Sequence, residues 1–255
     1  MHLLFLIIYM HKKILNFSTT VRKNWKTTVK CYNYGMIFYH GSKQVIESPK
    51  EKGSKPYNDY GPSFYLTHDL ESAMFWACKH DNIGIVNKYE IRNNVFNELK
   101  ILDLTNKEKY SVLNWLAILV HFKDLESLFK TDNKEALEWL SKFYIDVNEY
   151  DIVIGFRADD SYWLFPEAFI NGAISIDELE MIYKLGDLGI QQAFMSERAI
   201  KALKFKGVIE CDETYVGKYY ERIKEANKVI NSILHRGRSA SKKYIFDLMR
   251  ANYGK

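Results

Sequence analysis

Two short aromatic segments that each meet a glycine constrain the fold of this chain most strongly. In the first, the apolar run 36–39 ends on His40 and is followed by Gly41. In the second, residues 59–67 (DYGPSFYLT) place Gly61 shortly before an aromatic strand. A glycine lets a ligand approach the backbone, so the segments together offer a neutral imidazole, open amides and a tyrosine ring. These groups suit a planar carboxamide ring joined to a ribose, although two ordinary core strands would show the same local pattern.

Beyond residue 35 the chain alternates between strand-like and helix-like segments without an internal repeat, which predicts one α+β domain with appendages. Runs rich in Ile, Val, Tyr and Phe predict strands at 36–40, 63–66, 84–91, 150–156, 191–195 and 207–211. Helical periodicity predicts a helix capped by Asp69 that runs to His80, two helices within 107–143, and helices at 175–183 and 219–234. We expect a main domain at 36–211, an N-terminal extension at 1–35 and a basic helical extension at 212–255.

The charge of the chain is distributed unevenly. Residues 1–35 hold 6 Lys and Arg and no acid, and residues 201–255 hold 13 against 6 acids, which leaves 17 bases against 26 acids between them. This acidic middle argues against a nucleic-acid groove across the main domain. The C-terminal region is expected to present Lys224, Lys228, Arg236 and Arg238 outward, either toward an acidic partner or as an ordinary solvated helix surface.

The N-terminal segment and the cysteines indicate in which cellular compartment the protein is expected. The apolar run from Leu3 to Met10 is too short to span a bilayer, and its basic residues follow it, so it is also a poor signal peptide. Residues 1–35 are expected to be disordered or to precede the true start at Met36. Cys31, Cys78 and Cys211 have no metal or disulfide spacing. We therefore expect a cytoplasmic protein without a membrane partner.

Several segments occur together and in order: Tyr39-His40-Gly41-Ser42, 61–67, 150–160 (YDIVIGFRADD), 185–199 and 244–250. On these segments the chain resembles bacterial ADP-ribosyltransferase-like proteins of domain-of-unknown-function family 3990, related to the diphtheria-toxin and poly-ADP-ribose polymerase branch. The resemblance implies an α+β fold, namely an ADP-ribosyltransferase-like split β-sandwich with a helical insertion and a helical C-terminal extension. It also implies NAD as a co-substrate.

By this resemblance a histidine, a tyrosine and an acid on three strands form the NAD site. His40 would bind the adenosine ribose, Gly41 would pair its backbone with the nicotinamide carboxamide next to Ser42, and Tyr65 would stack on the nicotinamide ring. The second stacking position falls on Trp76, which fits the apolar face of a helix equally well. His40 alone would also suit a purely structural role.

The third position departs from the family pattern, because the strand expected to carry the catalytic glutamate reads GIQQAFMS at 189–196. Gln191 is the residue expected there, with Gln192 as the alternative, and both would also fit as ordinary strand amides. A carboxylate would orient the ribose hydroxyl and stabilise the positive charge that develops on the ribose, whereas an amide can only orient. Turnover is therefore expected to be slow or restricted.

Charge near the site is also available from the segment after the strand that ends at Phe156. Arg157 would contact a pyrophosphate, and Asp159 or Asp160 would act as the missing carboxylate or as a general base. The competing interpretation is that one of these acids caps a helix that begins near Ser161.

The chain lacks a phosphate-binding loop, a dinucleotide glycine fingerprint and a zinc motif, so no metal is expected. The main hypothesis is an NAD-dependent mono-ADP-ribosyltransferase, the toxin of a bacterial toxin–antitoxin pair, with a small antitoxin as partner and an unidentified acceptor macromolecule. A non-catalytic NAD or ADP-ribose binding module of the same fold is the alternative. An RNA phosphate-removing transferase would need more arginines around the cleft.

Overall fold

A computed structural model describes residues 35–51, 53–79, 83–123, 133–158, 164–185 and 189–251. Apart from Gly35, the expected N-terminal extension lies outside these residues, and so do His80, Asp159 and Asp160. The chain from Gly35 onward forms one compact unit.

The described strands are short. They are β1 (Met36–Ser42), β2 (Phe64–Leu66), β3 (Ile85–Ile91), β4 (Ile101–Asp103), β5 (Ile152–Phe156), β6 (Ile190–Phe194) and β7 (Lys204–Glu210). The helices are α2 (Leu70–Ala77), α3 (Asn93–Phe96), α4 (Val112–Lys123), α6 (Lys134–Ser141), α7 (Leu164–Ile170), α8 (Ile176–Leu185), α9 (Glu197–Ala202), α10 (Thr214–His235) and α11 (Ile245–Arg250), with a 3-10 turn, η1, at Val147–Glu149.

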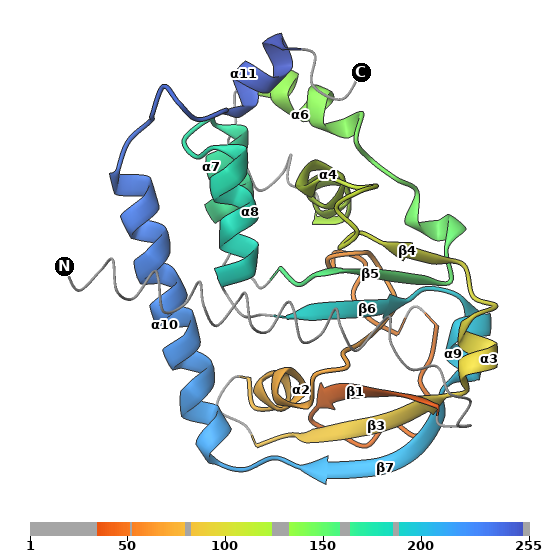
Figure 1. The fold of residues 1–255 in the computed structure, drawn as a ribbon. Helices are drawn as coiled ribbons and strands as arrows, with labels where there is room; N and C mark the ends of the chain where they lie inside the picture. The colour runs from red at the N-terminus through yellow and green to blue at the C-terminus, as the bar shows by residue number, and fades with distance from the viewer. Residues whose placement is uncertain are drawn as a thin grey trace. The chain divides into compact units, whose positions relative to one another are not determined.

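The strands form two open sheets, one ordered β1-β3-β7 and the other β2-β6-β5-β4 (Figure 1). Neighbouring strands are antiparallel except β4 and β5, which are parallel. The sheets meet where Tyr39 pairs with Thr67 just beyond the end of β2. β1 and β2 therefore join the two sheets at one point along their lengths.

Three apolar clusters hold the unit together. Side chains from both sheets share one cluster, in which Phe38 of β1 packs edge-on against Phe194 of β6 with ring centroids 5.3 Å apart. On the other face of the three-stranded sheet, Ala73 and Ala77 of α2 pack against Val86. The largest cluster joins α4, α6, α7, α8 and α11 to the other face of the second sheet. Apolar clusters thus lie on both faces of each sheet, while the edge strand β7 stays partly exposed.

The C-terminal helices belong to the same compact unit. Helix α10 contacts both α2 and α8, and Figure 1 shows it extending from beside one to beside the other. Ile233 of α10 and Ile245 and Leu248 of α11 are buried in the largest cluster. Lys224, Lys228, Arg236 and Arg238 are exposed, as the charge pattern predicts. None of the helices in the described ranges is long and apolar enough to cross a membrane.

Most predicted elements are confirmed. The architecture is α+β, and all six predicted strands exist. Asp69 caps α2 by accepting hydrogen bonds from the backbone of Glu71 (3.3 Å) and Ser72 (2.9 Å). In the described part of the segment 107–143 there are two helices, α4 and α6, whereas α10 begins at Thr214 rather than at residue 219. Strand β4 was not predicted, because its three residues gain their strand geometry from pairing with β5 rather than from a local pattern.

Candidate functional site

Gly41 of β1, which is buried, lies at the point where the two sheets part. Tyr39 and Thr67 exchange two backbone hydrogen bonds, of 2.8 and 2.9 Å. Because strand residues two apart turn their backbone groups to the same side, the N–H and C=O of Gly41 point toward the same edge as those of Tyr39. Continuing the register would pair Gly41 with Tyr65. Instead, the strands part, and no residue in the described part of the chain hydrogen-bonds to the backbone of Gly41 on this edge.

His40 bridges the gap between the parting strands. Its Nδ1 lies 2.7 Å from the carbonyl oxygen of Tyr65, so Nδ1 carries the hydrogen and donates it. Burial lowers the pKa of His40 to about 4; the hydrogen bond to Tyr65 opposes this effect, and the charge of Arg157 adds to it. The imidazole is therefore neutral at physiological pH, and its Nε2 is a hydrogen-bond acceptor. Its ring also packs on Phe64, with centroids 4.5 Å apart.

Tyr65 is fixed through its hydroxyl group by the loop that precedes β2. The hydroxyl accepts a hydrogen bond from the backbone of Tyr60 (3.0 Å) and donates one to the carbonyl of Gly61 (2.7 Å). Its ring lies stacked with that of Tyr60, with centroids 6.5 Å apart. Burial is the main cause that raises the pKa of Tyr65, and Asp59 raises it further.

Gly41 is a glycine for a different reason from the one expected. A Cβ atom there would lie 2.2 Å from the carbonyl oxygen of Ala73 and 2.6 Å from the nitrogen of Ala77, both in the backbone of α2. The missing side chain therefore permits α2 to pack on β1. Ser42 is turned into the following loop, where its hydroxyl donates to Gln44 and accepts from Asn87.

Trp76 and Arg157 are in direct contact. The guanidinium carbon of Arg157 lies 4.5 Å from the centre of the Trp76 ring, and the Nζ atom of Lys79 lies 4.6 Å from it. Trp76 is half-buried, whereas the Arg157 side chain is buried. Two cationic side chains therefore lie against the Trp76 ring, and the charge of one of them, Arg157, lowers the pKa of His40.

The amide of Gln191 is engaged by a carboxylate that the sequence analysis did not place in the site. Its Nε2 donates to Oδ2 of Asp59 at 2.7 Å, and the backbone N–H of Ala158 donates to the same oxygen at 2.8 Å. The other oxygen, Oδ1, lies 3.3 Å from Nζ of Lys123, the last residue of α4. Burial raises the pKa of Asp59, and Lys123 opposes this effect. In the sequence, Asp59 was marked only by its place in the segment 59–67. The sequence pattern did not indicate which residues its carboxylate would contact.

Gln192 occupies the opposite face of β6. It pairs with Leu66, whose side chain lies in the cluster between the sheets, and the two residues therefore share that face. Its Oε1 is buried and accepts no hydrogen bond in the described structure. Gln192 therefore lies apart from the face that carries Gln191.

The register of the second sheet places Gln191 with other predicted site residues. Gln191 shares a face with Ala193, two residues along β6, and Ala193 pairs with Tyr65. Gln191 also pairs with Gly155, and Arg157 follows two residues later on the same side. Tyr65, Gln191 and Arg157 therefore share one face of the sheet. Trp76 of α2 contacts this group through the guanidinium of Arg157.

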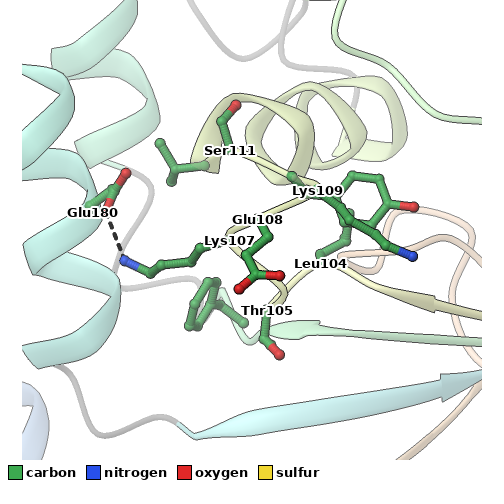
Figure 2. Close-up of a pocket in the computed structure, with 10 residues that line it drawn as sticks. Leu104, Thr105, Lys107, Glu108, Lys109, Ser111 and Glu180 are labelled. Atoms are coloured by element: carbon green, nitrogen blue, oxygen red, sulfur yellow. Dashed lines mark hydrogen bonds and ion pairs between the residues drawn. The ribbon is translucent and has the colours of Figure 1, made fainter.

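A pocket of about 260 Å³ lies between the loop after β4 and helix α8, where Lys107 reaches Glu180 (Figure 2). None of the residues predicted to bind NAD lines it, within the described ranges. Asp159 and Asp160 lie outside those ranges, so their predicted roles stay predictions. In the described part of the chain, no group of three or more His, Cys, Asp or Glu side chains is placed to hold a metal ion.

Comparison with curated proteins and with solved structures gave no match to this chain. The model of a family described as "Protein of unknown function (DUF3990)" matches residues 36–205, more than half of the chain. The protein, with the split strands and the His40, Tyr65 and Gln191 side chains described above, therefore belongs to the DUF3990 family.

Proposed function

We propose that this protein is an NAD-dependent mono-ADP-ribosyltransferase with an ADP-ribosyltransferase-like split β-sandwich. The observation that carries the proposal is the parting of β1 from β2 immediately after the Tyr39–Thr67 pair. It leaves the backbone N–H and C=O of Gly41, a buried residue, without a hydrogen-bond partner among the described residues, next to the neutral imidazole of His40, which in turn binds the carbonyl of Tyr65. A carboxamide needs one donor and one acceptor in this arrangement, and a ribose needs an acceptor for its hydroxyl groups.

The residues divide the work on NAD as follows. The Gly41 N–H would donate to the carboxamide oxygen, and its C=O would accept from the carboxamide nitrogen. His40 Nε2 would accept from a ribose hydroxyl, and Arg157 would balance the charge of the diphosphate. Gln191 would accept from a hydroxyl of the nicotinamide ribose through its Oε1, because its Nε2 is already bonded to Asp59.

The reaction breaks the bond between the nicotinamide nitrogen and C1′ of the ribose, and the bonding electrons leave with nicotinamide. A nucleophilic oxygen, nitrogen or sulfur of the acceptor then bonds to C1′ and loses its proton. The positive charge that develops on the ribose needs nearby negative charge. Asp59 lies one hydrogen bond behind Gln191 and is paired with Lys123, so this stabilisation is weaker than a carboxylate on β6 would give. We therefore expect slow turnover.

The amide at Gln191 also favours a second candidate, an NAD or ADP-ribose binding module that does not catalyse transfer. Both candidates predict NAD binding that depends on His40. They differ in the release of free nicotinamide, which only the transferase produces.

The test uses the full chain, NAD labelled on the adenylate phosphate, and a bacterial lysate as the source of acceptor. In His40→Asn the Asn amide keeps a donor toward the Tyr65 carbonyl but removes the Nε2 acceptor. His68→Asn is the matched control, because His68 Nδ1 makes the same kind of bond to the Ile37 carbonyl, also 2.7 Å. We expect label transfer and nicotinamide release by wild type and His68→Asn and their loss in His40→Asn. NAD binding without nicotinamide release would favour the binding module, and an absence of NAD binding would refute both candidates.

The toxin assignment is part of the same proposal and has its own test. Induced expression of wild type and His68→Asn in a bacterial host should arrest growth, whereas His40→Asn should be tolerated at equal protein level. The exposed cations at Lys224, Lys228, Arg236 and Arg238 would suit an acidic antitoxin. Growth arrest by all three proteins would show that toxicity does not depend on His40.

A further inference from the structure

We propose that Asp59 is a positioning residue of this site, whose carboxylate fixes the side-chain amide of Gln191 so that the amide oxygen is presented to bound NAD. The consequence for catalysis rests on the proposed function. The orientation of the Gln191 amide does not, and it can be measured without any turnover.

The contacts of Asp59 join three separate parts of the fold. Its Oδ2 receives hydrogen bonds from Gln191 on β6 and from the backbone of Ala158 beyond β5, and its Oδ1 faces Lys123 at the end of α4. All three partners are donors, and only the ionised carboxylate accepts from every one of them. Asp59 is 6% exposed, so these bonds form in a site from which water is largely excluded.

This arrangement determines which end of the Gln191 amide faces the carboxylate. A carboxylate accepts hydrogen bonds and cannot donate them, so Nε2 must face Asp59 and Oε1 must point away from it. Without the carboxylate, the amide would rotate between orientations, and its nitrogen would be presented to the ligand part of the time. The side-chain oxygen of Gln192, the next residue, accepts no hydrogen bond from the described residues, and Gln192 lies on the other face of the strand.

The loop that carries Asp59 also holds Tyr65. Tyr60 and Gly61, the two residues after Asp59, make both hydrogen bonds to the Tyr65 hydroxyl. The loop at Asp59 therefore holds both the hydroxyl of Tyr65 and the side-chain amide of Gln191. A residue that fixes the orientation of other site residues in this way has a positioning role.

Two double variants separate positioning from structural support. Changing Asp59 alone would leave the charge of Lys123 buried without its carboxylate, so both variants carry Lys123→Met. In Asp59→Asn/Lys123→Met the Asn oxygen still accepts from Gln191 and Ala158. In Asp59→Leu/Lys123→Met no acceptor remains. Both variants lack the ion pair, and they differ in whether residue 59 can hold the amide.

The first readout is the steady-state release of nicotinamide from NAD. We expect kcat of the Asp59→Leu/Lys123→Met variant to fall about ten-fold or more, with KM for NAD changed less than about three-fold, because a misaligned group affects the reacting state most. The Asn/Met variant should recover most of that loss. Equal kcat values in the two variants would overturn the proposal, because charge or support alone would then explain the result.

The second readout does not need activity. The chain has only three glutamines, Gln44, Gln191 and Gln192, so selective ¹⁵N labelling of glutamine side chains gives three assignable NH₂ groups. We expect one Gln191 amide proton to be shifted downfield in wild type and in the Asn/Met variant, and to lose that shift in the Leu/Met variant, with Gln192 as an internal reference. An unchanged Gln191 signal in the Leu/Met variant would overturn the positioning role. If wild type released no nicotinamide, the proposed function would fail while this readout still decided the orientation.

Discussion

The side-chain nitrogen of Gln191 lies 2.7 Å from a carboxylate oxygen of Asp59, and both side chains are more than nine-tenths buried. This contact brings a negative charge next to the strand position where the family pattern led us to expect an acid. It also explains why an amide suits β6, because two carboxylates at this distance could not both ionise.

Replacing Gln191 by Glu should therefore destabilise the folded protein. The new carboxyl group would face Asp59, which would raise its pKa and cost roughly 3 kcal/mol of stability at neutral pH. Because the folded-state pKa is raised, the loss should be small at acidic pH and should grow as pH rises past the value for an unfolded glutamate. Denaturant unfolding of Gln191→Glu and of Gln191→Glu/Asp59→Asn at several pH values measures this effect. Equal stability of the two variants at neutral pH would contradict it.

His40 should make stability depend on pH in a defined window. Its pKa is about 4 in the folded protein, mainly through burial, against an ordinary value of 6.5. The folded state therefore binds fewer protons than the unfolded state between these values, and its stability falls as pH drops from 6.5 toward 4 by about 3 kcal/mol in total. Above pH 7 the contribution is constant.

The measurement for His40 compares the unfolding free energy of wild type and His40→Asn at pH 7 and pH 4.5. Other groups titrate in both proteins and cancel in the difference. We expect wild type to lose stability relative to His40→Asn on acidification. A difference that stays constant would show that His40 is not buried as neutral imidazole.

The strands and the main helices could be predicted because their signals are local. Asp69 capped the helix it was expected to cap, and the aromatic runs at β1, β2 and β5 formed strands. Strand β4 could not be predicted, because three residues carry no period and their geometry comes from pairing with β5.

Some residues of the candidate site could be predicted and others could not, again because only local patterns can be recognised in the sequence. His40 and Tyr65 stand in recognisable segments, and the structure joins them through one hydrogen bond. The partner of Gln191 lies 132 residues away in the chain, and no spacing rule connects them. Lys123 is the last residue of α4, and the sequence pattern of that helix indicated only which residues are apolar. The ion pair between Lys123 and Asp59 could therefore be recognised only in the folded structure.

Gly41→Ala should destabilise the protein even when no NAD is present. The added methyl group would lie 2.2 Å from the carbonyl oxygen of Ala73, a backbone atom that cannot move without shifting α2. We expect a loss of roughly 2 kcal/mol or more in the unfolding free energy. Gly217→Ala in α10 is the control, because nothing lies within 4 Å of its added Cβ and alanine favours a helix by about 1 kcal/mol. Wild-type stability of Gly41→Ala would show that the glycine serves something other than packing.

Tyr65→Phe should slow catalysis while leaving the ring in place. The variant loses the hydroxyl that accepts from Tyr60 and donates to Gly61, so the loop that carries Asp59 is tied down less firmly. We expect a stability loss of about 1–3 kcal/mol and a lower kcat for nicotinamide release, because Asp59 then holds the Gln191 amide less rigidly. Tyr89→Phe is the matched control, since its hydroxyl also donates to a backbone carbonyl, that of Ile46, in a different loop. Tyr89→Phe should lose stability without a change in kcat. If the two variants changed kcat equally, the effect of Tyr65 would be one of general stability, and the loop 59–61 would have no special part in positioning the site.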